Sequence, residues 1–350
     1  MKKGPGIVLL SFSFTAGVTA AEIAGAPGGA ASALCLASAI LLVYSALAKG
    51  NQYLPLALTF ISLGALCRCT EAVTGTPPPL NPFPETLDFL CEAIESAGFP
   101  GENSSAIITA LLTGRRSGLP RETVQAFRVS GASHILALSG LHLGIIYLFV
   151  RRLLAFFGNT PPARFARSGI TLALCALYTV VTGAGPSTVR ALLFIIINEA
   201  GGAASGRRRS PAATFSIALM VQLAVRPSVI ASAGFQLSYL AMLGIIILYP
   251  GLSSWYPGRR GLLKGVWNAA SLSTSCQLFT APVAWWRFRS LPKYYLITNL
   301  LALPLTEGII ISALVCLILQ AMGIYPPVLI RACGEMVKLM EFCLETIASL

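Results

Sequence analysis

Residues 127–146 read FRVSGASHILALSGLHLGII, and the rest of the chain is organised around this stretch. It begins polar, with Arg128 and two serines, and runs into an apolar segment that holds both histidines of the chain, His134 and His142. Ser139 lies between them. Lipid offers polar side chains no hydrogen-bond partners, so a polar cluster here predicts a buried site that faces protein or a water-filled path.

The spacing within this stretch suits a helix with one polar face. At 100° per residue, Ser139 and His142 lie about 60° apart, and His134 and His142 about 80° apart, so His142 shares a face with either. Gly140 and Gly144 form a small-xxx-small pair, which lets another backbone come close.

Composition places the whole chain in a membrane. The 350 residues are 55% hydrophobic and 11% charged, whereas soluble domains carry about 25% charged residues. These values exclude a soluble enzyme. The net charge of +12 is explained first by basic residues in cytoplasmic loops, which act as topology signals.

Apolar runs of nearly bilayer length recur along the chain. They predict an all-α, polytopic transmembrane helical bundle of about 10–12 spans. The expected spans cover residues 7–24, 30–48, 53–66, 133–150, 165–181, 189–204, 213–225, 228–248, 262–285, 294–305, 307–322 and 328–348.

A more polar region interrupts these runs after the third span. Residues 85–97 form an amphipathic pattern, and residues 104–112 and 115–129 read as two further short helices. All three are too polar or too short to span, so we expect them on the membrane surface. The chain then divides into N-terminal transmembrane helices (1–69), extracytoplasmic interfacial helices (70–130) and a main membrane domain (131–350).

Charge sets the expected topology. If Lys2 and Lys3 are cytoplasmic, the basic loops at 151–167, 207–209 and 259–264 fall on the same side, as the positive-inside rule requires. The surface helices then lie on the outer face. The same count puts three basic residues outside, which indicates either a miscounted span or a basic functional site: Arg287, Arg289 and Lys293.

Metal and redox sites are not predicted. The nine cysteines show no ligand spacing, and no carboxylate or cysteine stands near the histidines to complete a coordination set. We interpret the cysteines as small apolar packing residues. For the histidines, hydrogen-bonded packing and a place in the wall of a path both remain open.

The sequence allows two possible roles for each of two polar residues in later spans. Arg190 follows GAGPST, so it either extends toward the lipid headgroups or joins a helix N-terminus in a positive end that attracts phosphate. Gln236, in GFQLS, either makes an interhelical hydrogen bond or lines a polar path, together with Ser238.

Two further sites lie toward the C-terminus. Asn299, Pro304 and Glu307 interrupt an apolar run, which predicts a broken helix that faces protein or a water-filled cavity. Trp286 and Arg287 fit an interfacial aromatic belt first, and a base-stacking surface second.

Four blocks in order resemble the competence domain of the ComEC competence-protein family, over most of residues 113–305. The blocks are Gly131 to His142, with Ile135 in place of the family's first leucine; Ser187, Arg190 and Ala191; Gly234 to Ser238; and a closing block with Asn299 and Pro304. The family is known as the inner-membrane channel for DNA internalisation in natural transformation.

The resemblance implies a multi-pass protein of the bacterial inner membrane that translocates single-stranded DNA, is not an enzyme and needs no cofactor. It also implies membrane lipids, a cytoplasmic helicase-like ATPase and an outer DNA receptor as partners. Residues 131–350 would form the competence-type transmembrane channel domain. The expected path residues are His134, Ser139, His142, Arg190, Gln236, Ser238 and Asn299, and the expected mouth residues are Arg128, Trp286 and Arg287.

The chain departs from the family in two ways. Many members carry an OB-like domain between early spans and a metallo-β-lactamase-like domain at the C-terminus, and neither pattern occurs here. We expect a fragment or a short member, and assign no nuclease activity. Two other classes stay open: a small-solute or lipid transporter or flippase, and a membrane scaffold for a missing nuclease domain.

Overall fold

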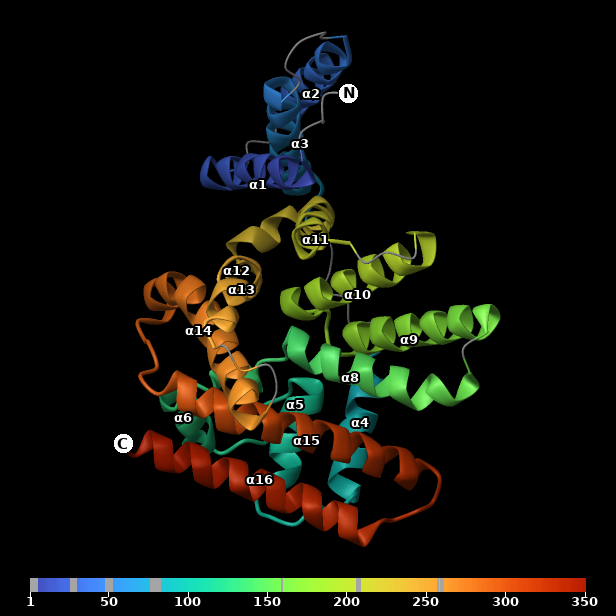
Figure 1. Cartoon of the computed structure of the whole chain (residues 1–350). Coiled ribbons are helices and arrows are strands. Elements are labelled where there is room, and N and C mark those ends of the chain that lie inside the picture. The colour runs from blue at the N-terminus through green and yellow to red at the C-terminus, as the bar shows by residue number, and fades with distance from the viewer. Residues whose placement is uncertain are drawn as a thin grey trace. The chain divides into compact units, whose positions relative to one another are not determined.

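The computed structural model describes residues 6–25, 30–47, 53–75, 83–158, 160–205, 209–256, 258 and 261–350. Every regular element in these ranges is a helix, which confirms the all-α class (Figure 1). The elements are α1 (Ile7–Ile23), α2 (Ala31–Leu47), α3 (Tyr53–Thr74), α4 (Pro84–Ser96), α5 (Ser104–Thr113), α6 (Arg121–Val129), α7 (Ser133–Leu136), α8 (Gly140–Leu153), η2 (Leu154–Phe157), α9 (Pro161–Val181), α10 (Pro186–Ser205), α11 (Pro211–Val225), η3 (Pro227–Ala231), α12 (Ala233–Ile247), α13 (Tyr249–Ser254), α14 (Leu262–Phe288), α15 (Tyr295–Ala321) and α16 (Pro327–Ala348).

The chain forms two compact units. The first unit comprises Met1–Pro79 and Leu193–Met242, and the second unit comprises Leu80–Leu192 and Leu243–Leu350. The three segments expected from the sequence describe position in a membrane, and that division stays a prediction.

The first unit is built around a very close contact between α1 and α3. A Cβ added to Gly17 would lie 1.9 Å from a main-chain oxygen of α3, and one added to Gly64 would lie 2.1 Å from a main-chain oxygen of α1. The two backbones therefore touch, which only glycine permits at these positions. Ser38 of α2 joins this pair by donating a hydrogen bond of 2.8 Å to Ser62.

A buried ionic cluster closes one end of the first unit. Glu71 is 6% exposed, and its carboxylate accepts hydrogen bonds of 2.7 Å from both the main-chain N–H and the hydroxyl of Ser228. Arg68 lies between Glu71 and Glu22, with which it forms an ion pair. These contacts tie η3 to α3 and α1.

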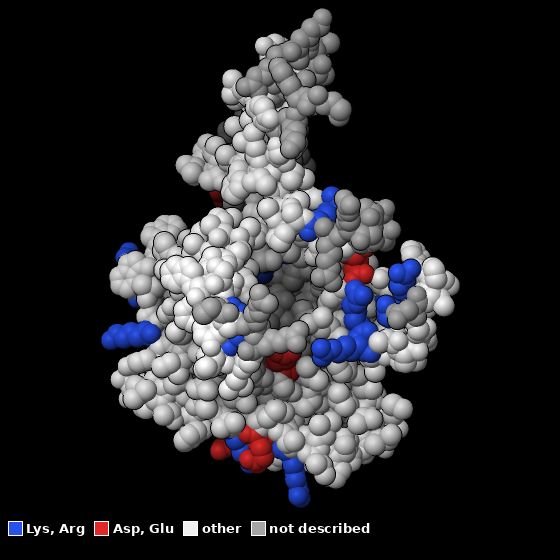
Figure 2. Space-filling model, in the orientation of Figure 1, with Lys and Arg blue, Asp and Glu red and all other residues white. Residues whose placement is uncertain are grey.

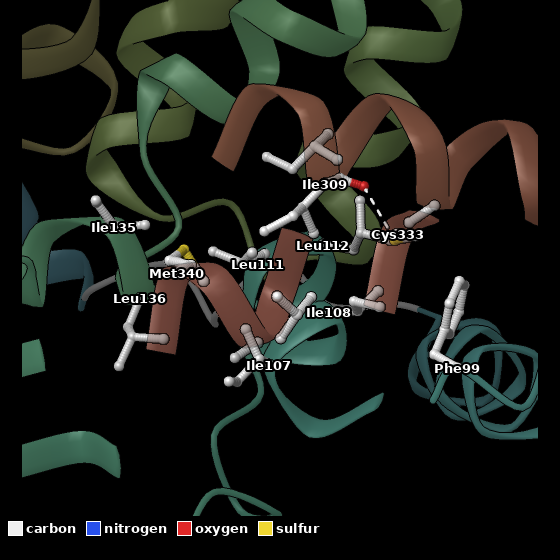
Figure 3. Packing of buried hydrophobic residues seen from close by; sticks show 14 of the residues in the cluster. Phe99, Ile107, Ile108, Leu111, Leu112, Ile135, Leu136, Ile309, Cys333 and Met340 are labelled. Carbon is white, nitrogen blue, oxygen red and sulfur yellow. Dashed lines mark hydrogen bonds between the residues drawn. The ribbon is translucent and has the colours of Figure 1, made fainter. Parts of the chain in front are cut away.

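The second unit has its hydrophobic core around α5. Ile107, Ile108 and Leu111 are fully buried, in a cluster that α15 and α16 complete (Figure 3). The helix expected at 104–112 is therefore present, but it is a core element and not a surface helix. Its small size and apolar sides let neighbouring helices enclose it.

α6 begins later than the sequence suggested. Helix was expected from residue 115, whereas it starts at Arg121 after Pro120. The residue before a proline is disfavoured from helical geometry, which explains the later start. α6 packs on α16 through one face and leaves Arg128 exposed on the other.

α15 corrects the prediction of a broken helix. The expected spans 294–305 and 307–322 form one continuous helix that passes through Pro304. Proline removes one main-chain hydrogen bond, but Ala302 and Ile309 on either side of it are fully or nearly buried in the core. Packing therefore holds both halves in line, and the predicted break at Asn299–Glu307 is wrong.

Four of the described helices are long and apolar enough to cross a membrane: Tyr53–Thr74, Gly140–Phe157, Pro161–Val181 and Tyr295–Ala321. Five shorter apolar helices accompany them, so the chain is a helical membrane protein, and the count of 10–12 spans stays a prediction. Figure 2 shows that charged residues occupy only small parts of the drawn face. Several of the topology signals lie outside the described residues: Lys2, Lys3, Arg207, Arg208, Arg259 and Arg260.

Candidate functional site

The stretch that was expected to form one helix over 133–150 is broken in the structure. α7 ends at Leu136, Ala137 and Ser139 are extended, and α8 starts at Gly140. The carbonyl of Leu136, which the break leaves without a helical partner, accepts a hydrogen bond of 3.1 Å from Nε of Arg116. The break is therefore a stabilised feature, and Arg116 is a contributor that sequence reasoning missed.

A capping box starts α8 and brings Ser139 and His142 together. The hydroxyl of Ser139 accepts the N–H of Leu141 at 3.2 Å, and Nδ1 of His142 accepts the main-chain N–H of Ser139 at 3.0 Å. The two side chains are also 2.9 Å apart. Ser139 and His142 are therefore the cap and the third residue of a helix start, whereas the sequence predicted them on a shared face of one unbroken helix.

This geometry fixes the proton on His142. Nδ1 accepts a main-chain N–H, so in the neutral ring Nε2 carries the hydrogen. The residue is 1% exposed, and Nε2 has no hydrogen-bond partner among the described residues. A buried donor left unsatisfied costs about 1–3 kcal/mol. His142 thus holds a donor for which the described part of the chain supplies no acceptor.

Arg190 lies against the start of α8. A Cβ added to Gly140 would be 3.0 Å from Nη2 of Arg190 and 3.1 Å from Cβ of Ala191. Arg190 occupies the second turn of α10. A helix N-terminus and a guanidinium are both positive, so the start of α8 joins two groups that favour an anion. A Cβ added to Gly144, by contrast, would have no neighbour within 4 Å. Of the small-xxx-small pair, only Gly140 therefore makes a close contact with another helix.

His134 and Asn299 belong to the same compact unit, but one side chain is exposed and the other has a buried polar atom. His134 is exposed, and its Nδ1 lies 3.1 Å from the carbonyl of Gly131 on the preceding turn. Oδ1 of Asn299 is buried and has no hydrogen-bond partner among the described residues. Next to it, Thr298 donates a hydrogen bond of 2.7 Å to the carbonyl of Ser130 and anchors α15 to the end of α6.

Gln236 and Ser238 lie in the first compact unit. The amide of Gln236 donates to the carbonyl of Ile230 at 2.9 Å, a local bond in place of the interhelical bond that was one of its two expected roles. Ser238 is buried at 9% exposure. The interhelical bond in this region comes from Tyr239, whose hydroxyl donates to Gln222 at 2.9 Å.

The expected mouth residues are exposed in the second unit. Trp286 is 65% exposed, and the guanidinium carbon of Arg287 lies 5.0 Å from its ring centroid. α14 ends at Phe288, and the following Arg289 takes left-handed geometry with φ of 52°. Arg128 is exposed in the last turn of α6. Among the described residues, no group of three or more potential metal ligands is found.

Comparison with known proteins matches most of the second unit and the Leu193–Met242 segment of the first unit. A family model described as "Competence protein" matches residues 111–350. ComE operon protein 3 of Bacillus subtilis (strain 168) is 34% identical over 145 residues, which is 41% of this chain and 18% of that protein. "Uncharacterized protein YcaI" of Escherichia coli (strain K12) is 28% identical over 229 residues, 63% of this chain and 29% of that protein.

The matches span less than a third of the length of either relative. No solved structure matches the chain. The family match includes every helix from α6 to α16. The break between α7 and α8 and Arg190 both lie within the matched residues. The chain belongs to the competence protein family.

Proposed function

We propose that this protein takes part in DNA uptake and conducts single-stranded DNA inward across the cytoplasmic membrane. The observation that carries the proposal is the start of α8, which holds the buried Nε2–H of His142 and against which Arg190 of α10 lies. Phosphate oxygens accept hydrogen bonds from such donors and are favoured by such charges.

Translocation needs contacts that are individually weak. A strand held by many tight phosphate contacts does not move, because affinity rises with each cation that meets a phosphate. One arginine and neutral donors suit this need better than a dense lysine lining. The proposed path residues remain His134, Ser139, His142, Arg190, Gln236, Ser238 and Asn299.

The packing of the second unit limits where a strand passes. The core between α5, α15 and α16 is closed, since Ile108, Leu111 and Ile309 are all 0% exposed. A path within this unit therefore runs on the side of α8 and α10. The dense core also favours the scaffold alternative, whereas the unsatisfied donor of His142 favours a path.

The driving force has to come from a partner, because the sequence contains no nucleotide-binding motif. We assign that role to a cytoplasmic helicase-like ATPase, and delivery of the strand to an outer DNA receptor. In this proposal the protein is a multi-pass component of the inner membrane, and no residue has a catalytic role.

Substitution of His142 by two isosteric residues tests the path. Glu and Gln both accept the Ser139 N–H and complete a capping box, so α8 still starts at Gly140 in both variants. Gln retains a donor, whereas Glu places a carboxylate where phosphate is expected. We expect His142→Gln to keep DNA uptake and His142→Glu to reduce it at least about tenfold, which corresponds to ~1.4 kcal/mol.

The measurement is entry of labelled DNA into transformable cells that carry the full-length protein, with membrane insertion quantified for each variant. Lys338→Gln is the control outside the proposed path, because Lys338 is an exposed residue of α16 that pairs with Glu335. Equal uptake by the His142 Glu and Gln variants at equal insertion would contradict the path.

A further inference from the structure

The connection between α14 and α15, residues 289–294, folds against the end of α6. A Cβ added to Gly131 would lie 2.5 Å from Cβ of Pro292, and Gly131 has φ of +90°, so this position accepts only glycine. The hydrogen bond from Thr298 to the carbonyl of Ser130 fixes the same junction. The end of α6 and the connection thus form one surface of the second unit, at the left of Figure 1.

This surface, hereafter the entry surface, gathers exposed basic side chains. They come from two segments far apart in sequence: Arg128 from α6, and Arg287, Arg289 and Lys293 from the end of α14 and the connection. In Figure 2, Lys and Arg atoms project at the edge where the connection lies in Figure 1. Trp285 and Trp286 are 51% and 65% exposed beside them.

An open recess of about 310 Å³ lies within the entry surface. Its size is at the lower end of the ~300–1,000 Å³ of small-ligand sites. Apolar atoms of Val129, Pro292 and Ile347 line it together with the polar side chains of Ser290, Lys293 and Tyr294. A flat apolar group that carries a negative charge matches this combination, and a nucleotide has both parts.

The neighbouring groove determines which anion fits. It is shallow, measures about 640 Å³, shares Val129 and Ala348 with the recess, and carries the carboxylates of Glu122 and Glu345 beside the single guanidinium of Arg121. A broad anionic membrane surface would meet these carboxylates and the basic side chains together. A single strand is narrow enough to contact the basic side chains alone, and its unpaired bases are free to stack.

We propose that the entry surface binds single-stranded DNA, with one base in the recess beside Tyr294 and the flanking phosphates on Lys293, Arg289 and Arg128. This inference deepens the proposed function and rests on it. Paired bases of a duplex remain stacked and cannot enter the recess, so the surface prefers single strands over duplexes.

Equilibrium binding of a fluorescent 20-nucleotide thymidine strand tests the inference, measured by anisotropy on the full chain in nanodiscs of neutral phosphatidylcholine. The variants are Lys293→Gln, Tyr294→Ala, and Arg289→Asn, which tolerates left-handed geometry. Lys338→Gln is the matched control, because Lys338 is an exposed lysine of the same unit that pairs with Glu335.

We expect Tyr294→Ala to weaken binding at least about fivefold through lost stacking. Each charge variant should lower the slope of log affinity against log salt by about 0.7, the value for one phosphate contact with a single strand. The control should bind as the wild type does, and a duplex of equal length should bind more weakly.

Wild-type binding with no loss in any of the three variants would overturn the inference. Variants that bind DNA normally but lose association with anionic vesicles would overturn it as well, and would assign the surface to lipid headgroups. Failure of the proposed function is distinguishable, since it shows as unchanged uptake in the His142 variants while equilibrium binding at the entry surface persists.

Discussion

At the scale of single residues, the start of α8 depends on a histidine in an unusual capping role. Sequence signatures of a capping box place Glu or Gln three residues after the cap, and here His142 takes that position after Ser139. Helical periodicity alone placed both residues on one face of an unbroken helix. The signal that would have indicated the break is the Ser-Gly pair at 139–140, because Ser139 is the N-cap and Gly140 is the first residue of α8.

Gly140 and Gly144 offer a matched pair for testing the contact with α10. In Gly140→Ala the new Cβ meets Nη2 of Arg190 at 3.0 Å and Cβ of Ala191 at 3.1 Å, so we expect a loss of about 1–3 kcal/mol from overpacking. Gly144→Ala meets nothing within 4 Å and gains helix propensity, so stability should rise by up to about 1 kcal/mol.

Thermal unfolding of both variants in the same detergent measures the difference. A lower melting temperature for Gly144→Ala than for Gly140→Ala would show that Arg190 does not lie against the start of α8.

At the scale of elements, the contact between α1 and α3 requires two glycines at once. Gly17→Ala or Gly64→Ala places a methyl group about 2 Å from a main-chain oxygen of the facing helix. Backbone cannot yield as a side chain does, so we expect losses at or above the ~3 kcal/mol upper range of overpacking. Gly169→Ala in α9, which meets nothing within 4 Å, is the control.

Denaturant titration of the purified chain provides the measurement for these glycine variants. If Gly17→Ala and Gly64→Ala unfold with the same midpoint as the control, the close crossing of α1 and α3 is refuted.

Pro304 tests whether α15 acts as one rigid helix. Proline in a helix interior costs about 3 kcal/mol, and here core packing keeps the helix continuous. Pro304→Ala should therefore raise the melting temperature and leave DNA uptake unchanged. A hinge at this position would instead require the proline, so a stable variant with strongly reduced uptake would refute the rigid helix.

At the scale of the whole molecule, the sequence predicted the class, the family and most helices, because apolar runs of bilayer length dominate it. Packing between distant segments was not predictable from local pattern. The sequence of α5 alone predicts a short surface helix. In the structure it lies in the core, because α15 and α16 pack around it. Pro304 predicts a helix break, but packing in the same core keeps α15 continuous.

The candidate site was predictable in part. Ser139, His142 and Arg190 were identified from local sequence pattern and from the family resemblance, and the structure brings Arg190 to the start of the helix that the other two cap. The role of Arg116 and the recess beside Lys293 depend on contacts between segments far apart in sequence. Gln236 makes a local hydrogen bond that periodicity did not indicate.

Site-specific photocross-linking during uptake tests the central claim most directly. A photoreactive amino acid is placed at Leu141, which is 46% exposed in the first turn of α8, or at Leu111 in the closed core as the control. Labelled single-stranded DNA that is passing through the membrane should cross-link at Leu141 and not at Leu111. Cross-links at neither position, in cells that still take up DNA, would contradict a path along the start of α8.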